Sequence, residues 1–488
     1  MPRPREATLP LIGRTVEQEQ LARAMASGRP ELIAVHGRRR IGKTHLIRTY
    51  FAKELCFEMT GVSGMSRAHQ LRNFAGSLRE ETTFQHAAPR DWTEAFEELT
   101  RYLDPLVRAG GRKVVFFDEL PWLAGRKSGF LPAFDHFWNS WGTRQRNLIV
   151  VICGSAASWM IAKVLHQKGG LHNRITSSIQ LQPFSLPEID AYLRSAGVKL
   201  DHRQTVELAM AIGGVPFYLN HVRKGWSAAQ NIHALFFAQN APLRDEFLQV
   251  FAALFEHHER HLQVIRALAK RQSGLQRKDI IRETDLGTGG GLTAILEELE
   301  ASGFICRMIP LGRTTRDPYY RLLDELTLFH LRWVERQGSG AAARDWPGQR
   351  LAPAGMAWSG YAFENICLRH STQIKKALGI ATVPASVCSW RHQPKPKAKG
   401  ETGAQIDLLF DRADGVISVC EMKFCDDEFV VDKEYARELR SKLDVFRRVS
   451  GTRKSVFLAI VTVCGVRAND YRAELVQNVV TLAALFEP

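Results

Sequence analysis

The segment GRRRIGKT at positions 37–44 constrains this chain more than any other. It matches the spacing GxxxxGK[ST], follows the apolar run ELIAVHG directly and precedes HLIRTYFAKEL, whose periodicity predicts a helix. Glycines in such a loop let backbone N–H groups surround phosphates, and the first turn of the helix adds the positive end of its dipole. The sequence therefore predicts a phosphate-binding loop between a buried strand and a helix.

The last two residues of this loop have separate chemical tasks. Lys43 is expected to reach the β- and γ-phosphates of a nucleotide, and Thr44 is expected to bind Mg²⁺ through its hydroxyl. The complete predicted nucleotide-binding set is Gly37, Arg38, Arg39, Arg40, Ile41, Gly42, Lys43, Thr44, Asp118 and Ser155.

Two further apolar runs end in polar residues that suit the same site. KVVFFDEL predicts a buried strand that ends in Asp118, a second Mg²⁺ ligand, followed by Glu119, which can orient or deprotonate an attacking water. NLIVVICGS predicts a strand that ends at Ser155, where a polar side chain can sense the γ-phosphate. Arg174 is a candidate catalytic arginine finger or sensor, although an ordinary surface arginine explains it equally well. Such near-continuous apolar runs are typical of a parallel sheet covered on both faces.

The first half of the chain also resembles a known family. The resemblance lies in the phosphate-binding loop and in LIGRTVEQEQL (11–21), FFDELPWLA (116–124), CGSAASWM (153–160), LQPFSLPEI (181–189) and GGVPFYL (213–219). Together they resemble the prokaryotic AAA-type ATPases often called the archaeal ATPase family, which lies close to the STAND signalling NTPases. The resemblance covers about residues 8–235 and implies ATP as the nucleotide, with LIGR against the adenine and GGVP in a helical lid. The preference for adenine over guanine rests on this resemblance alone.

Charge, hydropathy and cysteine content indicate which partners and which cellular location to expect. The 488 residues include 66 Lys and Arg against 51 Asp and Glu, a formal charge of +15, which favours polyanionic partners, although a basic surface alone explains it equally well. The longest apolar stretch, at 148–162, is shorter than the roughly 20 residues of a membrane span, and MPRPREATLP lacks the apolar core of a signal peptide. The eight scattered Cys lack metal-ligand spacing. We therefore expect a cytoplasmic protein without a membrane partner.

Residues from about 255 to 335 show the pattern of a winged helix–turn–helix. RHLQVIRALAK, LQRKDIIRETDL and GGLTAILEELEASGF predict three short amphipathic helices, and FICRMIP and PYYRLLD predict a two-stranded wing around LGRTTRD. Such a module would place its third helix in the DNA major groove, with Arg313 and Arg316 on phosphates. Because the third helix offers almost no basic or amide side chain to a base edge, an interdomain packing module explains the pattern better.

Carboxylates gather in the last third of the chain. GAQIDLLF predicts a strand that carries Asp407, DRADG predicts a tight turn, and VISVCEMKF predicts an antiparallel strand with Glu421 and Lys423 on one face and Met422 on the other. The predicted helix SGYAFENICLRHSTQIKKAL adds Glu364. Carboxylates suit Mg²⁺, and an adjacent lysine can activate a water beside a phosphate. We predict Asp407, Glu421 and Lys423 as catalytic residues, and Glu364, Asp407 and Glu421 as metal ligands.

This arrangement resembles the PD-(D/E)XK nuclease superfamily over about residues 350–488, with Ile406 in place of the proline before the aspartate. The resemblance implies metal-dependent hydrolysis of a nucleic acid, which we expect to be DNA, with RNA left open. A salt-bridge cluster on a catalytically inactive nuclease fold is the alternative. The loop RHQPKPKAKG, with Lys395, Lys397 and Lys399, is expected either to contact DNA or to act as a solvated tether.

These patterns together predict a multidomain α/β protein. A parallel-sheet P-loop ATPase domain with a helical lid spans 1–235, a winged-helix middle domain spans 236–340, and an α/β nuclease-like C-terminal domain spans 350–488. We expect an ATP- and Mg²⁺-dependent switch or motor that controls a DNA nuclease in defence or mobile-element maintenance. The alternatives are a STAND-like regulatory ATPase whose inactive nuclease fold only binds DNA or protein, and a winged-helix transcription or toxin–antitoxin regulator. The sequence leaves a homo-oligomer open.

Overall fold

The computed structural model describes residues 11–82, 87–125, 127–165, 173–287, 289–312, 318–335, 345–394 and 402–487. The chain divides into two compact units, residues 1–183 and 184–488. This division falls before the predicted helical lid, because the helices that follow residue 183 share one hydrophobic core with the rest of the second unit. The three-domain division at 235 and 340–350 stays a prediction.

The first unit is built on a parallel sheet of five described strands in the order β2-β3-β4-β1-β5. The strands predicted from ELIAVHG, KVVFFDEL and NLIVVICGS are β1, β3 and β4. The elements of this unit are α1 (Thr15–Ala26), β1 (Glu31–His36), α2 (Lys43–Tyr50), β2 (Leu55–Thr60), α3 (Arg67–Glu81), α4 (Trp92–Arg108), β3 (Lys113–Asp118), α5 (Leu120–Leu123), α6 (Phe130–Ser140), η1 (Gly142–Arg144), β4 (Leu148–Gly154), α7 (Ala157–Met160), η2 (Ile161–Leu165) and β5 (Ser177–Gln180).

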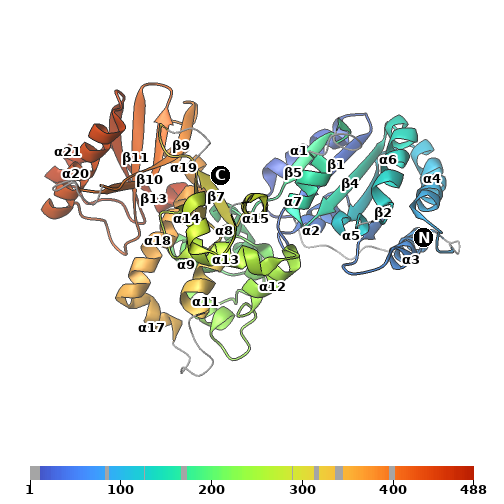
Figure 1. Ribbon diagram of the computed structural model, residues 1–488, viewed down its shortest axis with the longest axis horizontal. Helices are drawn as coiled ribbons and strands as arrows, with labels where there is room; N and C mark the ends of the chain where they lie inside the picture. Colours follow the sequence, from blue (N-terminus) through green and yellow to red (C-terminus); the bar gives the residue numbers. More distant parts are fainter. Residues whose placement is uncertain are drawn as a thin grey trace. The chain divides into compact units, whose positions relative to one another are not determined.

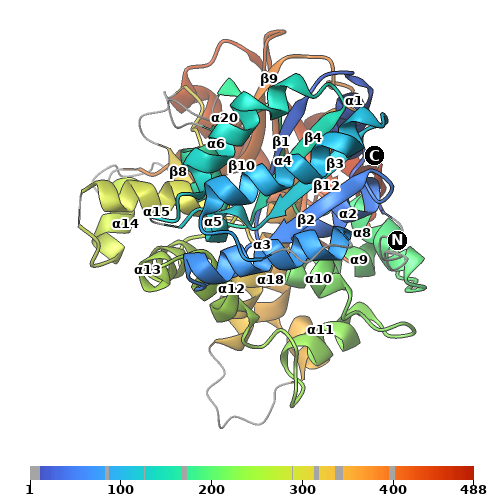
Figure 2. The ribbon, with the colours of Figure 1, turned by 90° about the vertical axis from the view of Figure 1, so that its right-hand side faces the viewer.

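Helices cover both faces of this sheet, which is why its central strands are apolar almost throughout. Helices α1 and α2 pack against one face through residues such as Leu21 and Leu46. Helices α3, α4 and α6 pack against the other face, where Phe96 and Phe117 belong to a cluster of aromatic rings. Figure 2 looks onto the face that α3, α4 and α6 cover. The prediction of a parallel sheet covered by helices on both faces is confirmed for this unit.

Parallel pairing also gathers the polar residues at one edge. The carboxyl ends of β1, β3 and β4 meet at the same side of the sheet, because adjacent parallel strands run in one direction. Gly37 follows β1, Asp118 ends β3 and Ser155 follows β4. Crevices at this edge of open α/β sheets are where such folds bind ligands.

The second unit begins with a group of helices and a small antiparallel sheet. Its described strands pair in the order β6-β8-β7. The elements are α8 (Leu186–Ser195), α9 (His202–Ile212), α10 (Pro216–Leu219), α11 (Ala228–Phe236), α12 (Glu246–Leu254), α13 (His258–Ala269), β6 (Leu275–Gln276), α14 (Arg277–Glu283), α15 (Gly290–Ala301), β7 (Ile305–Met308), β8 (Tyr319–Leu322), α16 (Glu325–Phe329) and η4 (His330–Val334).

The predicted three helices and two wing strands correspond to α13, α14, α15, β7 and β8, with the short β6 as an addition. The winged helix–turn–helix remains a proposal, because element order alone does not establish the module. Arg313 and Arg316, which were predicted to contact phosphates, lie outside the described residues.

The C-terminal part of the second unit is a mixed sheet in the order β13-β12-β11-β10-β9. Figure 1 shows strands of this sheet, among them β10 and β11, beside helices α20 and α21. The predicted hairpin is β10–β11, and β12 pairs with β11 in parallel. The strands β9 and β13 were not predicted. The elements are α17 (Trp346–Leu351), α18 (Pro353–Arg369), α19 (Ser371–Ala377), β9 (Ala385–His392), β10 (Ala404–Arg412), β11 (Val416–Lys423), α20 (Lys433–Ser450), β12 (Ser455–Thr462), α21 (Asp470–Leu475), β13 (Asn478–Thr481) and η5 (Leu482–Phe486).

Two helices cover opposite faces of this C-terminal sheet. Helix α18 shares a core with Leu408 and Met422, whereas α20 shares a separate core with Ile417 and Val419. Among the described helices, none combines the length and the apolar composition that crossing a membrane requires. Lys395, Lys397 and Lys399 of the predicted DNA-contacting loop lie outside the described residues.

The backbones of Gly214 and Phe184 approach each other closely, and a substitution at Gly214 tests this packing of the second unit. A Cβ added to Gly214 would lie 2.0 Å from the carbonyl oxygen of Phe184, whose N–H donates to the Gly214 carbonyl at 2.7 Å. We expect Gly214→Ala to lower the free energy of unfolding of this unit by about 1–3 kcal/mol, the usual cost of overpacking. Chemical denaturation of the full chain measures the loss.

The control is Gly360→Ala in α18, where an added methyl meets nothing within 4 Å. We expect this variant to be unchanged or stabilised by up to about 1 kcal/mol, because alanine reduces the entropy of the unfolded chain. Equal denaturation curves for the two variants would contradict the packing at Gly214.

Candidate functional site

The phosphate-binding loop has the backbone geometry that its glycines predict. Gly37 has a φ of +148°, and a Cβ there would lie 2.6 Å from the carbonyl oxygen of Leu181. Gly42 has a φ of +93° and precedes the first residue of α2. Both positions favour glycine, the first because of space as well as backbone conformation. Ile41 is buried beside them and anchors the loop in the core shared with α1 and α2.

Lys43 points its ammonium group into the loop. Its side chain is buried, and Nζ donates hydrogen bonds of 3.0 Å to the backbone carbonyls of both Gly37 and Arg38. Burial, and then the charge of Lys43, lowers the pKa of neighbouring His36 to about 4, so this imidazole is neutral at pH 7. Lys43 therefore supplies the positive charge at the centre of the loop, while Arg39 is exposed on its rim.

Thr44 and Asp118 meet at the start of α2. The Thr44 hydroxyl donates to Oδ2 of Asp118 at 2.6 Å, and the backbone N–H of Glu119 donates to the other carboxylate oxygen at 2.9 Å. Asp118 is 4% exposed, so these two donors stabilise a carboxylate that is nearly removed from water. A hydroxyl and a carboxylate at hydrogen-bond distance form a donor set that suits Mg²⁺.

Glu119 and Ser155 connect the ends of β3 and β4. Both the hydroxyl and the backbone N–H of Ser155 donate to Oε2 of Glu119, at 2.7 and 3.2 Å. Glu119 itself has a φ of +49°, in the left-handed region that costs a residue with a Cβ about 1–2 kcal/mol. The two hydrogen bonds hold this acid in one orientation beside Asp118.

The remaining loop arginines and Arg174 have different environments. Arg38 is buried, and Arg40 has a φ of +70°. Arg174 is exposed, three residues before β5, and is not among the described groups that hydrogen-bond to Lys43 or Glu119. Its role as an arginine finger stays a prediction.

Arg14 belongs to the segment LIGR, but its contacts were not predicted from the sequence. Its guanidinium is buried and donates to the backbone carbonyls of Ile41, at 3.1 Å, and Gln182, at 2.6 Å. It thus fastens the phosphate-binding loop to the segment after β5. The signal in the sequence was an arginine in the otherwise apolar LPLIGR, which the resemblance placed against the adenine.

The C-terminal carboxylates depend on a bulge in β10. Pairing with β9 shifts between Ile406, opposite Trp390, and Leu409, opposite Cys388, so β10 has one extra residue there. As a result Ile406 and Leu409 both pack on the α20 side, whereas strict alternation would place them on opposite faces. Asp407 lies inside this bulge.

Arg321 of β8 binds the two carboxylates nearest to the bulge. Its Nη1 lies 2.9 Å from Oδ1 of Asp407, and its Nη2 lies 3.1 Å from Oε2 of Glu364. Its side chain is 4% exposed, and its guanidinium carbon lies 5.0 Å from the ring centroid of Tyr361. Burial lowers the pKa of Arg321. Its interactions with Tyr361, Asp407 and Glu364 outweigh this effect, so the pKa lies above its ordinary value. Sequence reasoning missed this residue, because 86 positions separate it from Asp407.

Glu364 is affected by the same charges. Burial, and then repulsion from Asp407, raises the pKa of Glu364 to about 7, although Arg321 acts in the opposite direction. The Nε2 amide of Gln405 donates to Oδ1 of Asp407 at 2.8 Å. The carboxylate pair is therefore held by one arginine and one amide.

Glu421 has a different partner. Nζ of Lys442, on α20, lies 2.5 Å from its Oε1, and the Tyr435 hydroxyl donates to Oε2 at 3.4 Å. Lys423 is on the same face, as predicted, with Nζ at 4.5 Å from the Tyr435 ring centroid, while Met422 packs on the α18 side. Burial, and then Glu421, raises the pKa of Tyr435.

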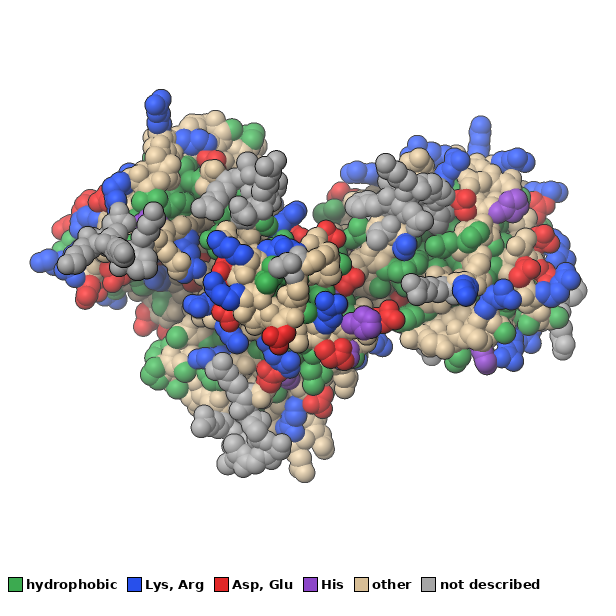
Figure 3. All heavy atoms as spheres, viewed as in Figure 1, with side chains coloured by type: hydrophobic (Ala, Val, Ile, Leu, Met, Phe, Trp, Pro, Cys, Tyr) green, Lys and Arg blue, Asp and Glu red, His purple; other side chains and the backbone are tan. Residues whose placement is uncertain are grey.

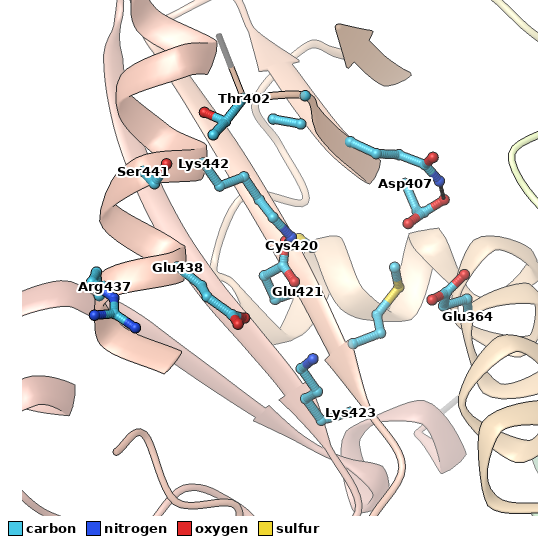
Figure 4. Close-up of a pocket in the computed structure, with 14 residues that line it drawn as sticks. Glu364, Thr402, Asp407, Cys420, Glu421, Lys423, Arg437, Glu438, Ser441 and Lys442 are labelled. Carbon is cyan, nitrogen blue, oxygen red and sulfur yellow. Dashed lines mark hydrogen bonds and ion pairs between the residues drawn. The ribbon is translucent and has the colours of Figure 1, made fainter. Parts of the chain in front are cut away.

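One cavity of about 660 Å³ is lined by Glu364, Asp407, Glu421 and Lys423, and we call it the carboxylate cavity. Figure 4 shows Glu421 beside Lys442, apart from Asp407 and Glu364. Among the described residues, no three His, Cys, Asp or Glu side chains are grouped closely enough to hold a metal ion. The structure thus brings the predicted residues to one cavity, where Arg321 and Lys442 form ion pairs with the predicted metal ligands.

The first half of the chain matches a known family. Residues 11–222 match the family described as an ATPase domain predominantly from Archaea. The chain therefore has an ATPase domain of the archaeal type. This confirms the prediction of ATP binding and hydrolysis for this part of the chain, and ATP or ADP is the ligand that such a domain implies.

Similarities over longer stretches are weaker. An uncharacterized protein of Methanocaldococcus jannaschii is 21% identical over 415 residues, which are 82% of this chain and 83% of that protein. The Walker-type ATPase of Pyrococcus abyssi has a TM-score of 0.47 at 18% identity, over 68% of this chain and 99% of its own. The ORC2 protein of Aeropyrum pernix has a TM-score of 0.42 at 16% identity, over 67% and 95%.

Two substitutions separate nucleotide binding from hydrolysis. We expect Lys43→Ala to weaken ATP binding by about a hundredfold, because a charge-assisted hydrogen bond to phosphate contributes about 1.5–3 kcal/mol. We expect Glu119→Gln to keep ATP binding but to slow hydrolysis by roughly 10²–10⁴-fold, because an amide cannot accept the proton from water. Calorimetric titration and phosphate release measure the two effects, and wild-type turnover by Glu119→Gln would remove Glu119 from this role.

Proposed function

We propose that the chain is an ATP-driven switch whose C-terminal domain acts on nucleic acid. The observation that carries the ATPase part is the connected set Thr44–Asp118 and Glu119–Ser155 at the sheet edge beside Lys43. Lys43 and the loop N–H groups would hold the phosphates, and Thr44 and Asp118 would hold Mg²⁺, which neutralises phosphate charge when bound.

In the hydrolytic step, Glu119 has the part of orienting a water and taking its proton. Ser155 fixes the Glu119 carboxylate through two hydrogen bonds, so it contributes to the position of the base. Arg174 is proposed to stabilise the charge that develops on the γ-phosphate. Because Arg174 is exposed, it would serve either this copy after closure or a second copy of the chain.

The finer part of the proposal is a metal-dependent nuclease in the carboxylate cavity. Asp407, Glu364 and Glu421 have the oxygen donors that suit Mg²⁺, and Lys423 lies on the face of Glu421, where it would act on a water. However, Arg321 and Lys442 already neutralise these carboxylates. A divalent cation at Asp407 and Glu364 would therefore compete with Arg321 for their negative charge.

The ion pairs also favour a second candidate function. Arg321 and Lys442 satisfy the carboxylates without any metal, as expected for a regulatory ATPase of STAND type with an inactive nuclease fold that only binds DNA or protein. A winged-helix regulator is a third proposal, supported by the arrangement of α13–α15 with the β6-β8-β7 sheet. Metal binding separates the first two candidates.

Arg321→Gln is the sharpest test of metal binding. Without the guanidinium, Asp407 and Glu364 repel each other, so the metal-free variant should melt below wild type. Mn²⁺ should then raise its melting temperature more than that of wild type, because the cation no longer competes with arginine. Asp407→Asn should abolish the Mn²⁺ response in either background. Thermal melting of the full chain with Mn²⁺ or EDTA measures these shifts.

The matched control is Arg369→Gln, because Arg369 forms a similar ion pair with the buried Glu325, at 2.5 Å, in the same unit. It should be destabilised without gaining a response to Mn²⁺. If Mn²⁺ moves neither wild type nor Arg321→Gln, the metal site is excluded and the inactive nuclease fold is favoured.

Cleavage itself is tested with supercoiled plasmid, Mg²⁺ or Mn²⁺, and ATP or a non-hydrolysable analogue. We expect wild type to nick the plasmid in a metal-dependent way and Lys423→Ala to lose at least about tenfold in rate, as removal of a general acid–base group does. Glu119→Gln shows whether ATP turnover is needed. Nicking that is insensitive to both Lys423→Ala and Asp407→Asn would come from another source and would overturn the assignment.

A further inference from the structure

A second cavity, of about 590 Å³, lies next to the carboxylate cavity and has an unusual charge. Of the described residues that line it, five are basic and one, Glu335, is acidic. Glu335 already pairs with Arg266, with 2.7 Å between Oε1 and Nη2. We call this space the basic cavity, and its cations are Arg266, Lys270, Arg271, Arg332 and Arg391.

The basic residues come from three separate elements that converge. Lys270 and Arg271 follow the end of α13, Arg332 belongs to η4 and Arg391 belongs to β9. Arg391 is held in place, because its Nη1 donates to the hydroxyl of Ser273 at 2.6 Å. Lys270, Arg271 and Arg332 are exposed, so their charges remain accessible from solvent.

The basic cavity shares lining residues with a cavity that borders the proposed catalytic residues. A smaller cavity of about 330 Å³ shares Ser273, Arg391 and Gln405 with it and continues to Arg321 and Asp407. Gln405 lines all three cavities and donates to Asp407. Gln405 thus borders the basic cavity and also contacts the carboxylate of Asp407.

The net positive charge of the chain alone would not identify the basic cavity as a binding site for anions. Lys and Arg side chains are spread over the viewed faces of both units, with Asp and Glu between them (Figure 3). The basic cavity differs because its cations surround one concave space, where like charges repel unless an anion lies between them. An anion with several phosphates in a row compensates such a set better than a single ion.

We propose that the basic cavity binds the sugar–phosphate backbone of a nucleic acid and directs it past Gln405 toward Asp407. This inference rests on the proposed function of the carboxylate cavity, but it concerns binding and not cleavage. DNA and RNA share the phosphodiester chemistry that these cations recognise, so duplexes of the same sequence in both forms distinguish the source.

The test is the full-length variant K270Q/R271Q/R332Q/R391Q. Fluorescence anisotropy with labelled 20-base-pair DNA and RNA duplexes, in EDTA and at several salt concentrations, measures affinity without cleavage. We expect affinity at about 0.1 M salt to fall roughly 10- to 100-fold and the salt slope to decrease by up to about four phosphates' worth. ATP turnover should stay at the wild-type value, and an unchanged thermal melt of the full chain shows that the second unit is folded.

The matched control removes four exposed cations elsewhere in the second unit, in K199Q/K224Q/K433Q/R453Q. It should keep most of the affinity. Equal losses in the two variants, or wild-type affinity and slope in the first, would overturn the proposal. Wild-type binding without any cleavage would support the basic cavity and refute only the nuclease function. Cleavage by the first variant at the wild-type rate, at a nucleic-acid concentration below saturation, would refute the basic cavity alone.

Discussion

Asp118 and Asp407 both stand on strands whose neighbours are buried, where water does not solvate a carboxylate fully. Each therefore needs a partner from another element, and the partner decides what the site can do. Asp118 receives a neutral hydroxyl from Thr44 and a backbone N–H, which leaves its negative charge available to a cation. Asp407 receives the full positive charge of Arg321. The carboxylate of Asp118 thus keeps its net negative charge, whereas that of Asp407 is compensated by an arginine.

The ion pairs of Arg321 connect the middle of the chain to its C-terminal sheet. Arg321 lies on β8, beside β6 and β7, yet its guanidinium binds Glu364 of α18 and Asp407 of β10. The hydrophobic core of the second unit is likewise continuous from Phe184 to Leu485. The charge compensation at Asp407 therefore depends on how the small β6-β8-β7 sheet packs against the C-terminal part of the unit.

The basic cavity gives the same segment a second role. It is formed where α13 and η4 of the middle segment meet α18 and β9, so the proposed nucleic-acid contact and the ion pair at Asp407 would depend on the same packing. The sequence offered the third helix of the predicted winged helix, and the loop with Lys395, Lys397 and Lys399, as candidate DNA contacts. The residues that actually surround a concave space, such as Arg332 and Arg391, carry no motif, because their proximity arises only when distant elements pack together.

The sequence by itself determined the parallel sheet, the phosphate-binding loop and the pairing of β10 with β11, because strand periodicity, glycine spacing and turn residues act over a few neighbouring positions. It also predicted that Asp118 and Glu119 end a buried strand. The tertiary structure alone decided the partners of the buried charges: Arg14 on the loop, Arg321 on Asp407 and Lys442 on Glu421. A buried ion recruits whichever opposite charge the packing brings within hydrogen-bond distance, and local pattern does not encode that choice.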